Sequence, residues 1–166
     1  MADEISPQEA PRIPGEEDLI SICRELNVRG VKYIVVGGFA IIHHGYLRAT
    51  EDIDLLLDES LENQNRVKQA LQILPDKAIL ELGDDDLRDY VVVRVADEVL
   101  VDLMLSACGI TYDEAKSQIE IVEIRGVPIP FANPELLLRM KQTYRDKDIP
   151  DRIFLQNKIA GKEPEI

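Results

Sequence analysis

The chain has 166 residues, a formal net charge of −13 and an apolar fraction of 45%. This length fits one domain with a hydrophobic core. The acidic balance argues against electrostatic binding of free nucleic acid, which needs a basic face. The longest apolar run, at about residues 33–42, is too short to span a membrane. We therefore expect a soluble, cytoplasmic protein with no membrane partner.

Domain organisation is indicated by the composition of the chain ends. Residues 1–15 hold three prolines among acidic and small residues, which predicts a flexible N-terminal arm. We expect a single domain at 16–160 and a short C-terminal tail at 161–166. The two cysteines, Cys23 and Cys108, lack the spacing of metal ligands, so we expect both to be reduced, buried thiols.

Apolar periodicity and turn residues predict the elements of the first half of the chain. In order, we expect a helix from Glu16 ended by Gly30, a strand at 33–36, a helix at 39–44, a strand at 52–57 and a helix from the N-cap Ser60 to about Leu74. The strand at 52–57 must be central, because its apolar residues leave little surface for solvent.

The second half of the chain predicts paired strands followed by helices. After a polar turn at 84–86, we expect a hairpin of 90–95 and 98–104 around Ala96-Asp97, a strand pair at 119–124 and 127–131, a helix from Pro134 to about Tyr144 and a last helix from the cap Asp148 to Gly161. This order predicts an α/β (α+β) fold with a mixed central β-sheet flanked by helices.

Two aspartates stand one residue apart in the predicted strand 52–57. Side chains alternate between the faces of a strand, so Asp52 and Asp54 project from the same face. Carboxylates this close repel each other unless a cation lies between them. The pair therefore predicts a site for a hard divalent cation, and the nearby Gly37-Gly38 turn offers backbone N–H groups to a phosphate.

These residues resemble the nucleotidyltransferase superfamily, whose fold DNA polymerase beta shares with aminoglycoside and small bacterial nucleotidyltransferases. The superfamily pattern is an apolar residue with Gly-Gly or Gly-Ser, then Asp-apolar-Asp, then a third carboxylate on a neighbouring strand. Here Val36-Gly37-Gly38 and Asp52-Ile53-Asp54 match the first two parts, and Asp102 matches the third.

A second set of residues resembles the branch that includes AbiEii-type toxins. Arg48 and Thr50 match its Arg-x-Thr-x-Asp lead-in, and the segments 136–141 and 145–151 match its closing Lys…Arg-x-Lys-Asp-x-x-Asp pattern. The resemblance thus covers roughly residues 33–155, which is most of the chain.

The resemblance implies an enzyme that moves a nucleoside monophosphate from a nucleoside triphosphate, such as ATP, to an acceptor hydroxyl. It implies two Mg²⁺ ions, or Mn²⁺ in their place, as cofactors. Asp52, Asp54 and Asp102 would be both the catalytic residues and the metal ligands. Asp102 would also accept the proton of the acceptor hydroxyl.

The resemblance also implies four nucleotide-binding residues. Gly37 and Gly38 would let the backbone approach the phosphates, and Arg48 and Lys141 are candidates for phosphate contact. The sequence departs from the pattern of many active members, because Gly38 stands where they have a serine whose hydroxyl helps to hold the triphosphate.

Each assignment has a structural alternative. Asp52 and Asp54 could lie on an exposed edge strand, Asp102 could face solvent, and Gly37-Gly38 could be only a tight turn. Arg48 could make a surface ion pair and Lys141 could be a solvated helix residue. His43 and His44, adjacent on a helix, point about 100° apart and so cannot form one ligand pair; we expect one to pack and one to be solvated.

Two functions from different classes remain. The first is the nucleotidyltransferase, with a small cationic molecule, a protein hydroxyl or an RNA as acceptor; a transfer RNA would need a local basic patch near Arg139, Lys141 and Arg145. The second is a catalytically silent binding or regulatory module with a protein partner, as in a toxin–antitoxin pair. The acidic arm at 1–15 could dock on such a partner.

Overall fold

The computed structural model describes residues 10–143 and 145–162. The helices are α1 (Glu16–Val28), α2 (Gly37–His43), α3 (Leu61–Ala70), α4 (Asp86–Asp89), α5 (Tyr112–Ala115), α6 (Pro134–Met140) and α7 (Ile149–Ile159), with 3₁₀ turns at Leu71–Ile73, Ala78–Glu81 and Asp146–Asp148. The strands are β1 (Tyr33–Val36), β2 (Asp52–Leu57), β3 (Val93–Ala96), β4 (Leu100–Met104), β5 (Ser106–Ala107), β6 (Ile110–Thr111), β7 (Ile119–Ile124) and β8 (Val127–Ala132).

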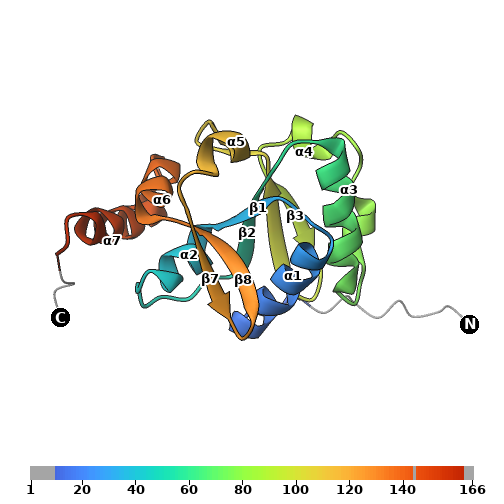
Figure 1. Cartoon of the computed structure of the whole chain (residues 1–166), viewed down its shortest axis with the longest axis horizontal. Coiled ribbons are helices and arrows are strands. Elements are labelled where there is room, and N and C mark those ends of the chain that lie inside the picture. The colour runs from blue at the N-terminus through green and yellow to red at the C-terminus, as the bar shows by residue number, and fades with distance from the viewer. Residues whose placement is uncertain (1–9, 144, 163–166) are drawn as a thin grey trace, which may run out of the picture.

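In the described part of the chain, six strands form one mixed sheet in the order β3-β4-β2-β1-β8-β7. The β2–β4 and β1–β8 pairs are parallel and the other pairs are antiparallel. Strands β5 and β6 form a small separate hairpin. The predicted fold class, a mixed central sheet with helices packed on it, is confirmed, and β2 lies inside the sheet as expected (Figure 1).

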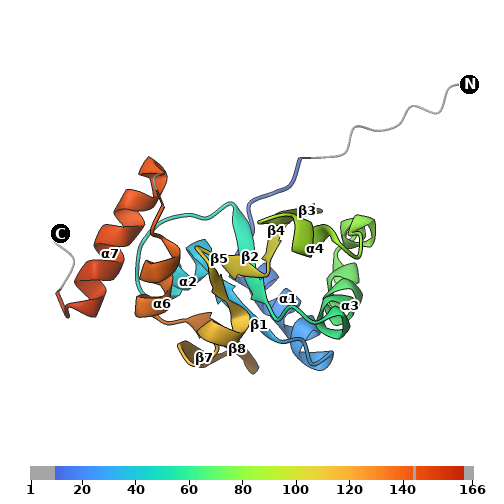
Figure 2. The ribbon, with the colours of Figure 1, turned by 90° about the horizontal axis from the view of Figure 1, so that it is seen from above.

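The helices pack in two groups. Helix α1 packs against β8 and α3, whereas α2 packs against β1, β2 and α6. Helix α7 contacts α6, and the two lie together at one end of the molecule, away from α3 (Figures 1 and 2). The C-terminal helices therefore form a lobe next to the end of the sheet where α2 begins.

Burial explains why β1 and β2 occupy the centre. All four residues of β1 are buried, and so are Ile53 and the segment 55–57 of β2, whereas Asp52 and Asp54 are only partly buried. A strand that is covered on both faces has a nearly continuous apolar sequence. Ser60 caps α3 as predicted, because its side chain accepts a hydrogen bond from the Asn63 amide at 3.1 Å.

Several predicted boundaries are wrong, among them the start of one strand and the end of one helix. The strand expected from Tyr90 begins only at Val93, because the Tyr90 amide donates to Asp86 O at 2.9 Å and so closes the last turn of α4. The helix expected to continue to about Tyr144 ends at Met140, and Lys141 follows it in a non-helical conformation. Tyr144 itself lies outside the described residues.

The expected arm and tail fall largely outside the described residues. Residues 1–9 and 163–166 are not among them. Of the rest of the arm, Arg12 donates from its backbone amide to Glu98 O at 2.9 Å and pairs with Asp18 at 2.6 Å. None of the helices within 10–143 and 145–162 has the length and apolar composition needed to cross a membrane.

Candidate active site

The register of the sheet places charged residues in a row across adjacent strands. Asp54 on β2 is paired with Asp102 on β4, and Asp102 is paired in turn with Arg94 on β3. On its other side, Asp54 is opposite Val36, the last residue of β1. Paired residues of neighbouring strands project from the same face. Residues far apart in the sequence therefore meet on one face of the sheet.

The three predicted aspartates come together as one group, called here the acid cluster: Asp52, Asp54 and Asp102. One carboxylate oxygen from each lies within 4.8 Å of those of the other two. Asp102 is only 6% exposed, which rules out the alternative that it faces solvent. Three carboxylates at such distances fit the oxygen-ligand preference of Mg²⁺ or Mn²⁺.

Electrostatics add to the case that the acid cluster can hold a cation. Burial raises the pKa of Asp54 well above its ordinary value of 3.8, and the nearby Asp52 and Asp102 carboxylates raise it further. A carboxyl in this setting is costly to ionise unless a positive charge is added. The donor set therefore suits a divalent cation.

The Gly37-Gly38 turn is shaped by the acid cluster. Gly37 has φ +67°, and a Cβ atom built on it would lie 2.7 Å from Asp54 Cγ, so no side chain fits there. Only glycine combines this left-handed backbone with so close an approach. The turn is thus more than a connection, because it brings backbone directly against the Asp54 carboxylate.

The second glycine of the turn explains the departure from the Gly-Ser pattern. A Cβ atom at Gly38 would lie 2.6 Å from Thr50 Cβ and 3.2 Å from Arg48 Nη2. Thr50 is buried, and its hydroxyl donates to Asp52 O at 3.1 Å. The Thr50 side chain therefore fills the space that a serine at position 38 would need.

Arg94 is the site residue that the sequence interpretation missed. Its Nε donates to Asp102 Oδ1 at 2.9 Å, and its Nη2 donates to Asp102 Oδ2 at 2.9 Å and to Asp52 Oδ2 at 3.0 Å. The hydrogen bonds to Asp102, followed by the charges of the acid cluster, raise the pKa of the guanidinium above its ordinary value. The available signal was a lone charged residue between valines in the strand that pairs with the Asp102 strand.

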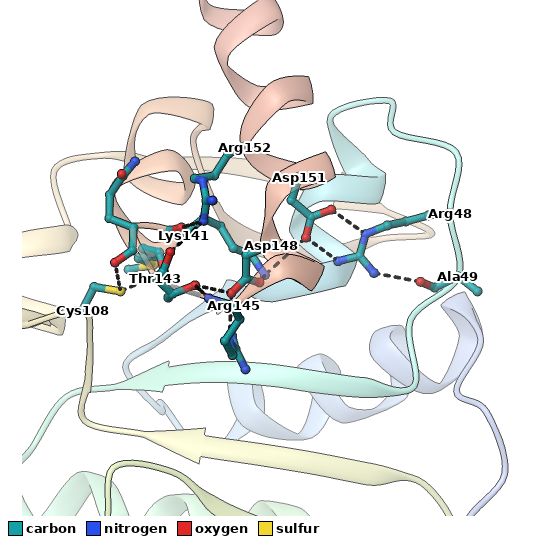
Figure 3. A network of polar contacts seen from close by, with 11 residues as sticks. Arg48, Ala49, Cys108, Lys141, Thr143, Arg145, Asp148, Asp151 and Arg152 are labelled. Carbon is teal, nitrogen blue, oxygen red and sulfur yellow. Dashed lines mark hydrogen bonds and ion pairs between the residues drawn. The ribbon is translucent and has the colours of Figure 1, made fainter.

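The two predicted phosphate-binding cations belong to a second group, the helix ion-pair cluster: Arg48, Lys141, Arg145, Asp148 and Asp151 (Figure 3). Arg48 Nη2 donates to Asp151 Oδ2 at 3.1 Å, and Arg48 Nε lies 3.0 Å from Asp151 Oδ1 without hydrogen-bond alignment. Lys141 Nζ lies 3.1 Å from Asp148 Oδ1 and 3.3 Å from Asp151 Oδ2. Both cations therefore have carboxylate partners already.

Two side chains besides Lys141 hold the Asp148 carboxylate, those of Arg145 and Thr143. Asp148 is 1% exposed, accepts from Arg145 Nε at 2.9 Å and accepts from the Thr143 hydroxyl. Burial alone would raise the pKa of Asp148, but the bonds from Thr143 and Lys141 and the Arg145 charge bring it below its ordinary value. Asp148 was expected to cap α7, but its side chain makes no cap hydrogen bond. Its carboxylate bonds to the helix ion-pair cluster instead.

The acid cluster and the helix ion-pair cluster line one pocket with a volume of about 780 Å³. Its wall also includes the Gly37-Gly38 turn, Val91, Val92 and Cys108. Cys108 is exposed rather than buried, which corrects the expectation for this thiol, whereas Cys23 is buried as expected. Cys108 leaves the core because it forms the β5–β6 turn, where its φ is 48°.

The two histidines differ from their expected arrangement. The His43 ring stacks on Phe131 with centroids 4.1 Å apart, and the 8%-exposed His44 donates from Nε2 to Ala132 O at 2.9 Å. Neither is fully solvated. Ligand atoms of His43, His44 and Glu120 lie within 4.8 Å of one another, so the expectation that the two histidines cannot form one ligand pair was wrong. The two imidazole rings turn toward each other, with centroids 5.1 Å apart, although the His44 amide still makes the helical hydrogen bond to Ala40 O at 3.2 Å.

Comparison with known proteins gives a consistent picture of the fold. No protein-family model matches the sequence, and no curated protein matches it significantly. Among solved structures, the lincosamide antibiotic adenylyltransferase LnuA, lincomycin-bound, is 17% identical with a TM-score of 0.56, covering 89% of this chain and 99% of its own. The structure of ANT(2")-Ia in complex with adenylyl-2"-tobramycin is 14% identical with a TM-score of 0.54, covering 85% and 87%.

A third solved structure extends the likeness beyond antibiotic-modifying proteins. An antigenic nucleotidyltransferase-like protein from Paracoccidioides brasiliensis is 20% identical with a TM-score of 0.53, covering 88% of this chain and 78% of its own. Similarity over most of both chains at such low identities is evidence about architecture, while chemistry must be argued from the site. By its sheet, its helices and these likenesses, the chain has the nucleotidyltransferase fold.

Proposed function

We propose that the protein is a divalent-metal-dependent nucleotidyltransferase that moves a nucleoside monophosphate from a nucleoside triphosphate to an acceptor hydroxyl. One observation carries the proposal: the acid cluster, built from two adjacent strands, lies beside a glycine turn that no side chain could replace. A structural sheet gains nothing from three crowded carboxylates on one face, since the repulsion lowers its stability.

Metal binding falls to the acid cluster in this proposal. Asp52, Asp54 and Asp102 would hold Mg²⁺ or Mn²⁺ through carboxylate oxygens, and the remaining ligands would come from water and phosphate. Bound there, the ions supply charge neutralisation on the phosphate oxygens and on the attacking and leaving oxygens. Mg²⁺ fits the all-oxygen donor set, and the same donors accept Mn²⁺.

The protein groups then position the reactants. The acceptor oxygen forms a bond to the α-phosphorus while the bond from that phosphorus to the pyrophosphate oxygen breaks, and pyrophosphate leaves. The Asp102 carboxylate would receive the proton of the acceptor hydroxyl. The backbone of the Gly37-Gly38 turn would approach the phosphates, because neither residue carries a Cβ atom in the way.

Arg48 and Lys141 would contribute positive charge to the same pocket. Both line it, and both are also engaged with Asp151. Arg48 is 3.2 Å from where a Gly38 Cβ atom would lie, so its guanidinium is next to the glycine turn. In the proposal these cations keep the phosphate side of the pocket positive, opposite the negative acid cluster.

The acceptor is proposed by likeness and charge. Two of the similar structures carry an antibiotic or an adenylylated antibiotic in their names, lincomycin and adenylyl-2"-tobramycin. The net charge of −13 favours a cationic small molecule over an RNA. The basic patch that an RNA acceptor would need is also partly neutralised, because Lys141 and Arg145 pair with Asp148.

A second candidate function is a non-catalytic module that keeps the fold as a regulatory part, as in a toxin–antitoxin pair. It is favoured by one observation, that both predicted phosphate-binding cations already have buried carboxylate partners. Such a protein would bind a protein partner and would show no turnover.

The test is calorimetric titration of ATP, GTP, CTP and UTP, each with and without Mg²⁺, into wild-type protein and Asp52→Asn. The enzyme predicts Mg²⁺-dependent binding of at least one triphosphate to wild type, lost in Asp52→Asn. Asp113→Asn is the matched control, because Asp113 is an exposed carboxylate whose ion-pair partner among the described residues is Lys116. Binding of no triphosphate to wild type would favour the non-catalytic module.

A further inference from the structure

We propose that Arg94 is an internal counter-cation of the acid cluster, which a divalent ion must displace from Asp52 and Asp102 in order to bind. This inference rests on the proposed function, since it takes the acid cluster as a metal site. It adds a residue that sets when the site is loaded. Nothing in the sequence pattern of the superfamily pointed to position 94.

The geometry places the guanidinium on the atoms that a metal would use. Arg94 makes two parallel hydrogen bonds to the two oxygens of Asp102, both 2.9 Å, and a third to Asp52 Oδ2 at 3.0 Å. Carboxylate oxygens engaged by a bidentate guanidinium have fewer lone pairs to offer a cation. Arg94 and a divalent ion are therefore alternatives on Asp102 and Asp52.

The charge balance says why the arginine is there. The acid cluster brings one oxygen from each of three carboxylates within 4.8 Å of the others, so their negative charges repel one another. Among the described residues, Arg94 is the cation that hydrogen-bonds to this cluster. Without a metal ion, the guanidinium offsets part of the repulsion, so the sheet tolerates the site when it is empty.

The position of Arg94 permits it to leave. Its side chain is 53% exposed, whereas that of Asp102 is 9% exposed, so the arginine approaches the cluster from the solvent side. It stands on β3, an edge strand of the sheet, and it lines the same pocket as the glycine turn. A long, exposed side chain on an edge can turn aside without disturbing the core.

Release gives Arg94 a second partner within reach. A guanidinium carries five donors in a planar fork that matches phosphate oxygens as well as carboxylates. A triphosphate entering with its metal would supply such oxygens in the pocket that Arg94 lines. Metal and nucleotide would then bind cooperatively, because the nucleotide offers the displaced arginine new hydrogen-bond acceptors.

The experiment measures Mn²⁺ binding to the full chain without nucleotide, by electron paramagnetic resonance of free Mn²⁺. The variants are Arg94→Gln, Arg94→Lys and, as matched control, Arg88→Gln, an exposed arginine whose partners are Asp85 and Asp89. We expect Arg94→Gln to bind Mn²⁺ about tenfold more tightly than wild type. Arg88→Gln should equal wild type.

The lysine variant separates displacement from a general charge effect. Lysine keeps the positive charge but cannot form the bidentate pair, so displacement predicts that Arg94→Lys also binds Mn²⁺ more tightly than wild type. If only Arg94→Gln gains affinity, the effect is one of net charge and the displacement is refuted. Affinity in Arg94→Gln that is equal to or below that of wild type refutes it as well.

Failure of the proposed function gives a different pattern. Asp54→Asn should abolish Mn²⁺ binding in both the wild-type and the Arg94→Gln backgrounds. If neither wild type nor Arg94→Gln binds Mn²⁺, the metal site itself is wrong and the inference fails with it. If wild type binds through Asp54 but Arg94→Gln gains nothing, the metal site stands and only the role of Arg94 is lost.

A structural readout follows the arginine itself. In a ¹⁵N spectrum the Nε–H signal of Arg94, assigned by its loss in Arg94→Lys, should be protected from exchange with water while it donates to Asp102. Adding diamagnetic Mg²⁺ should shift this signal and speed its exchange. A signal that stays unchanged at Mg²⁺ concentrations that saturate the site would contradict displacement.

Discussion

The acid cluster and the helix ion-pair cluster face the same pocket and hold charge in opposite ways. In the acid cluster, three carboxylates share one arginine whose side chain is 53% exposed. In the helix ion-pair cluster, two carboxylates that are 1% and 4% exposed are matched by three cationic side chains (Figure 3). One group is short of positive charge and the other is not.

This difference in charge balance suits the acid cluster to ligand binding and the helix ion-pair cluster to a structural role. Buried charges persist when partners satisfy them, and the helix ion-pair cluster ties α7 to α6 and to the loop before β2 in this way. Unsatisfied carboxylates are costly and are retained where a ligand completes them. The comparison supports the proposal that metal ions bind at the sheet, in a pocket whose wall the C-terminal helices position.

The largest effect is expected from a substitution in the acid cluster, which should lower activity and leave the fold intact. Asp54→Asn should lower the rate of nucleotidyl transfer by about 10³-fold, because it removes a metal ligand in nearly the same shape. The free energy of unfolding without metal should not fall, because a carboxyl that is costly to ionise is replaced by a neutral amide. Pyrophosphate release and urea unfolding measure the two quantities. An unfolded variant would place Asp54 among the structural residues instead.

The next largest effect is expected from a substitution in the helix ion-pair cluster, which should lower stability. Asp151→Ala leaves Arg48 and Lys141 without one of their carboxylates in a buried setting, which should cost about 3 kcal/mol of unfolding free energy. Urea unfolding measures it. The control is Asp113→Ala, which removes an exposed carboxylate from a surface pair with Lys116 and should cost little. Equal losses in the two variants would contradict the structural role of Asp151.

Sequence reasoning succeeded where one strand carries the signal. The strands 33–36 and 52–57 were predicted with their observed bounds, because the first is a continuous apolar run and the second is apolar apart from its two aspartates. Asp52 and Asp54 were recognised as sharing a face from strand alternation alone. The nucleotidyltransferase fold followed from the resemblance of these motifs, and the solved structures confirm it.

Sequence reasoning failed where register between strands decides the contact. The expected two-residue turn at 96–97 would pair Val95 with Glu98 and put Arg94 opposite Val99. Instead Ala96 is paired with Leu100, which puts Arg94 opposite Asp102. The turn is longer because the buried Asp97 side chain accepts from distant backbone amides at Asp76 and Ala78. Such a tertiary bond leaves no local pattern to read.

The C-terminal contacts were beyond sequence reasoning for a related reason. Arg48 and Asp151 are separated by 103 residues, and each looks like a surface charge in its own segment. Asp148 was predicted as a helix cap because aspartate favours that position. In the structure its carboxylate is drawn to Lys141, Thr143 and Arg145 instead. The competition between local capping and long-range pairing is settled only by packing.

A smaller effect is expected in the pH dependence of stability, through the carboxyl of Asp54. The folded protein holds the Asp54 proton more tightly than the unfolded chain, so this carboxyl stabilises the metal-free fold below its ordinary pKa of 3.8. That contribution is lost as the pH rises through the raised pKa of the folded state. Relative to Asp54→Asn, wild type should therefore lose unfolding free energy as the pH rises above the ordinary aspartate pKa of 3.8.

Urea unfolding in the presence of a chelator gives both pH profiles, and adding Mg²⁺ should remove the difference between them. Asp113→Asn is a control of opposite sign. The hydrogen bond from Lys116 lowers the pKa of Asp113, so its contribution is present at neutral pH and is lost as the pH falls. Parallel profiles for wild type and Asp54→Asn would contradict the strain assigned to the acid cluster.

The smallest effect concerns the exposed edge of the helix ion-pair cluster. The Arg145 side chain is 58% exposed although the side chain of its partner Asp148 is only 2% exposed, so water screens the pair from one side. Arg145→Ala should cost at most about 1 kcal/mol, because Lys141 and Thr143 still bond to Asp148.

The sign of its pH dependence identifies the cause of that small loss. The lowered pKa of Asp148 stabilises the fold at neutral pH, and this contribution is lost as the pH falls through the folded-state pKa. Removing Arg145 weakens one of the charges that lower this pKa, so acid unfolding should begin at a higher pH than in wild type. Raised salt should shrink the difference, because it screens an exposed pair more than a buried one. A loss as large as that of Asp151→Ala would show that exposure does not set the strength of these pairs.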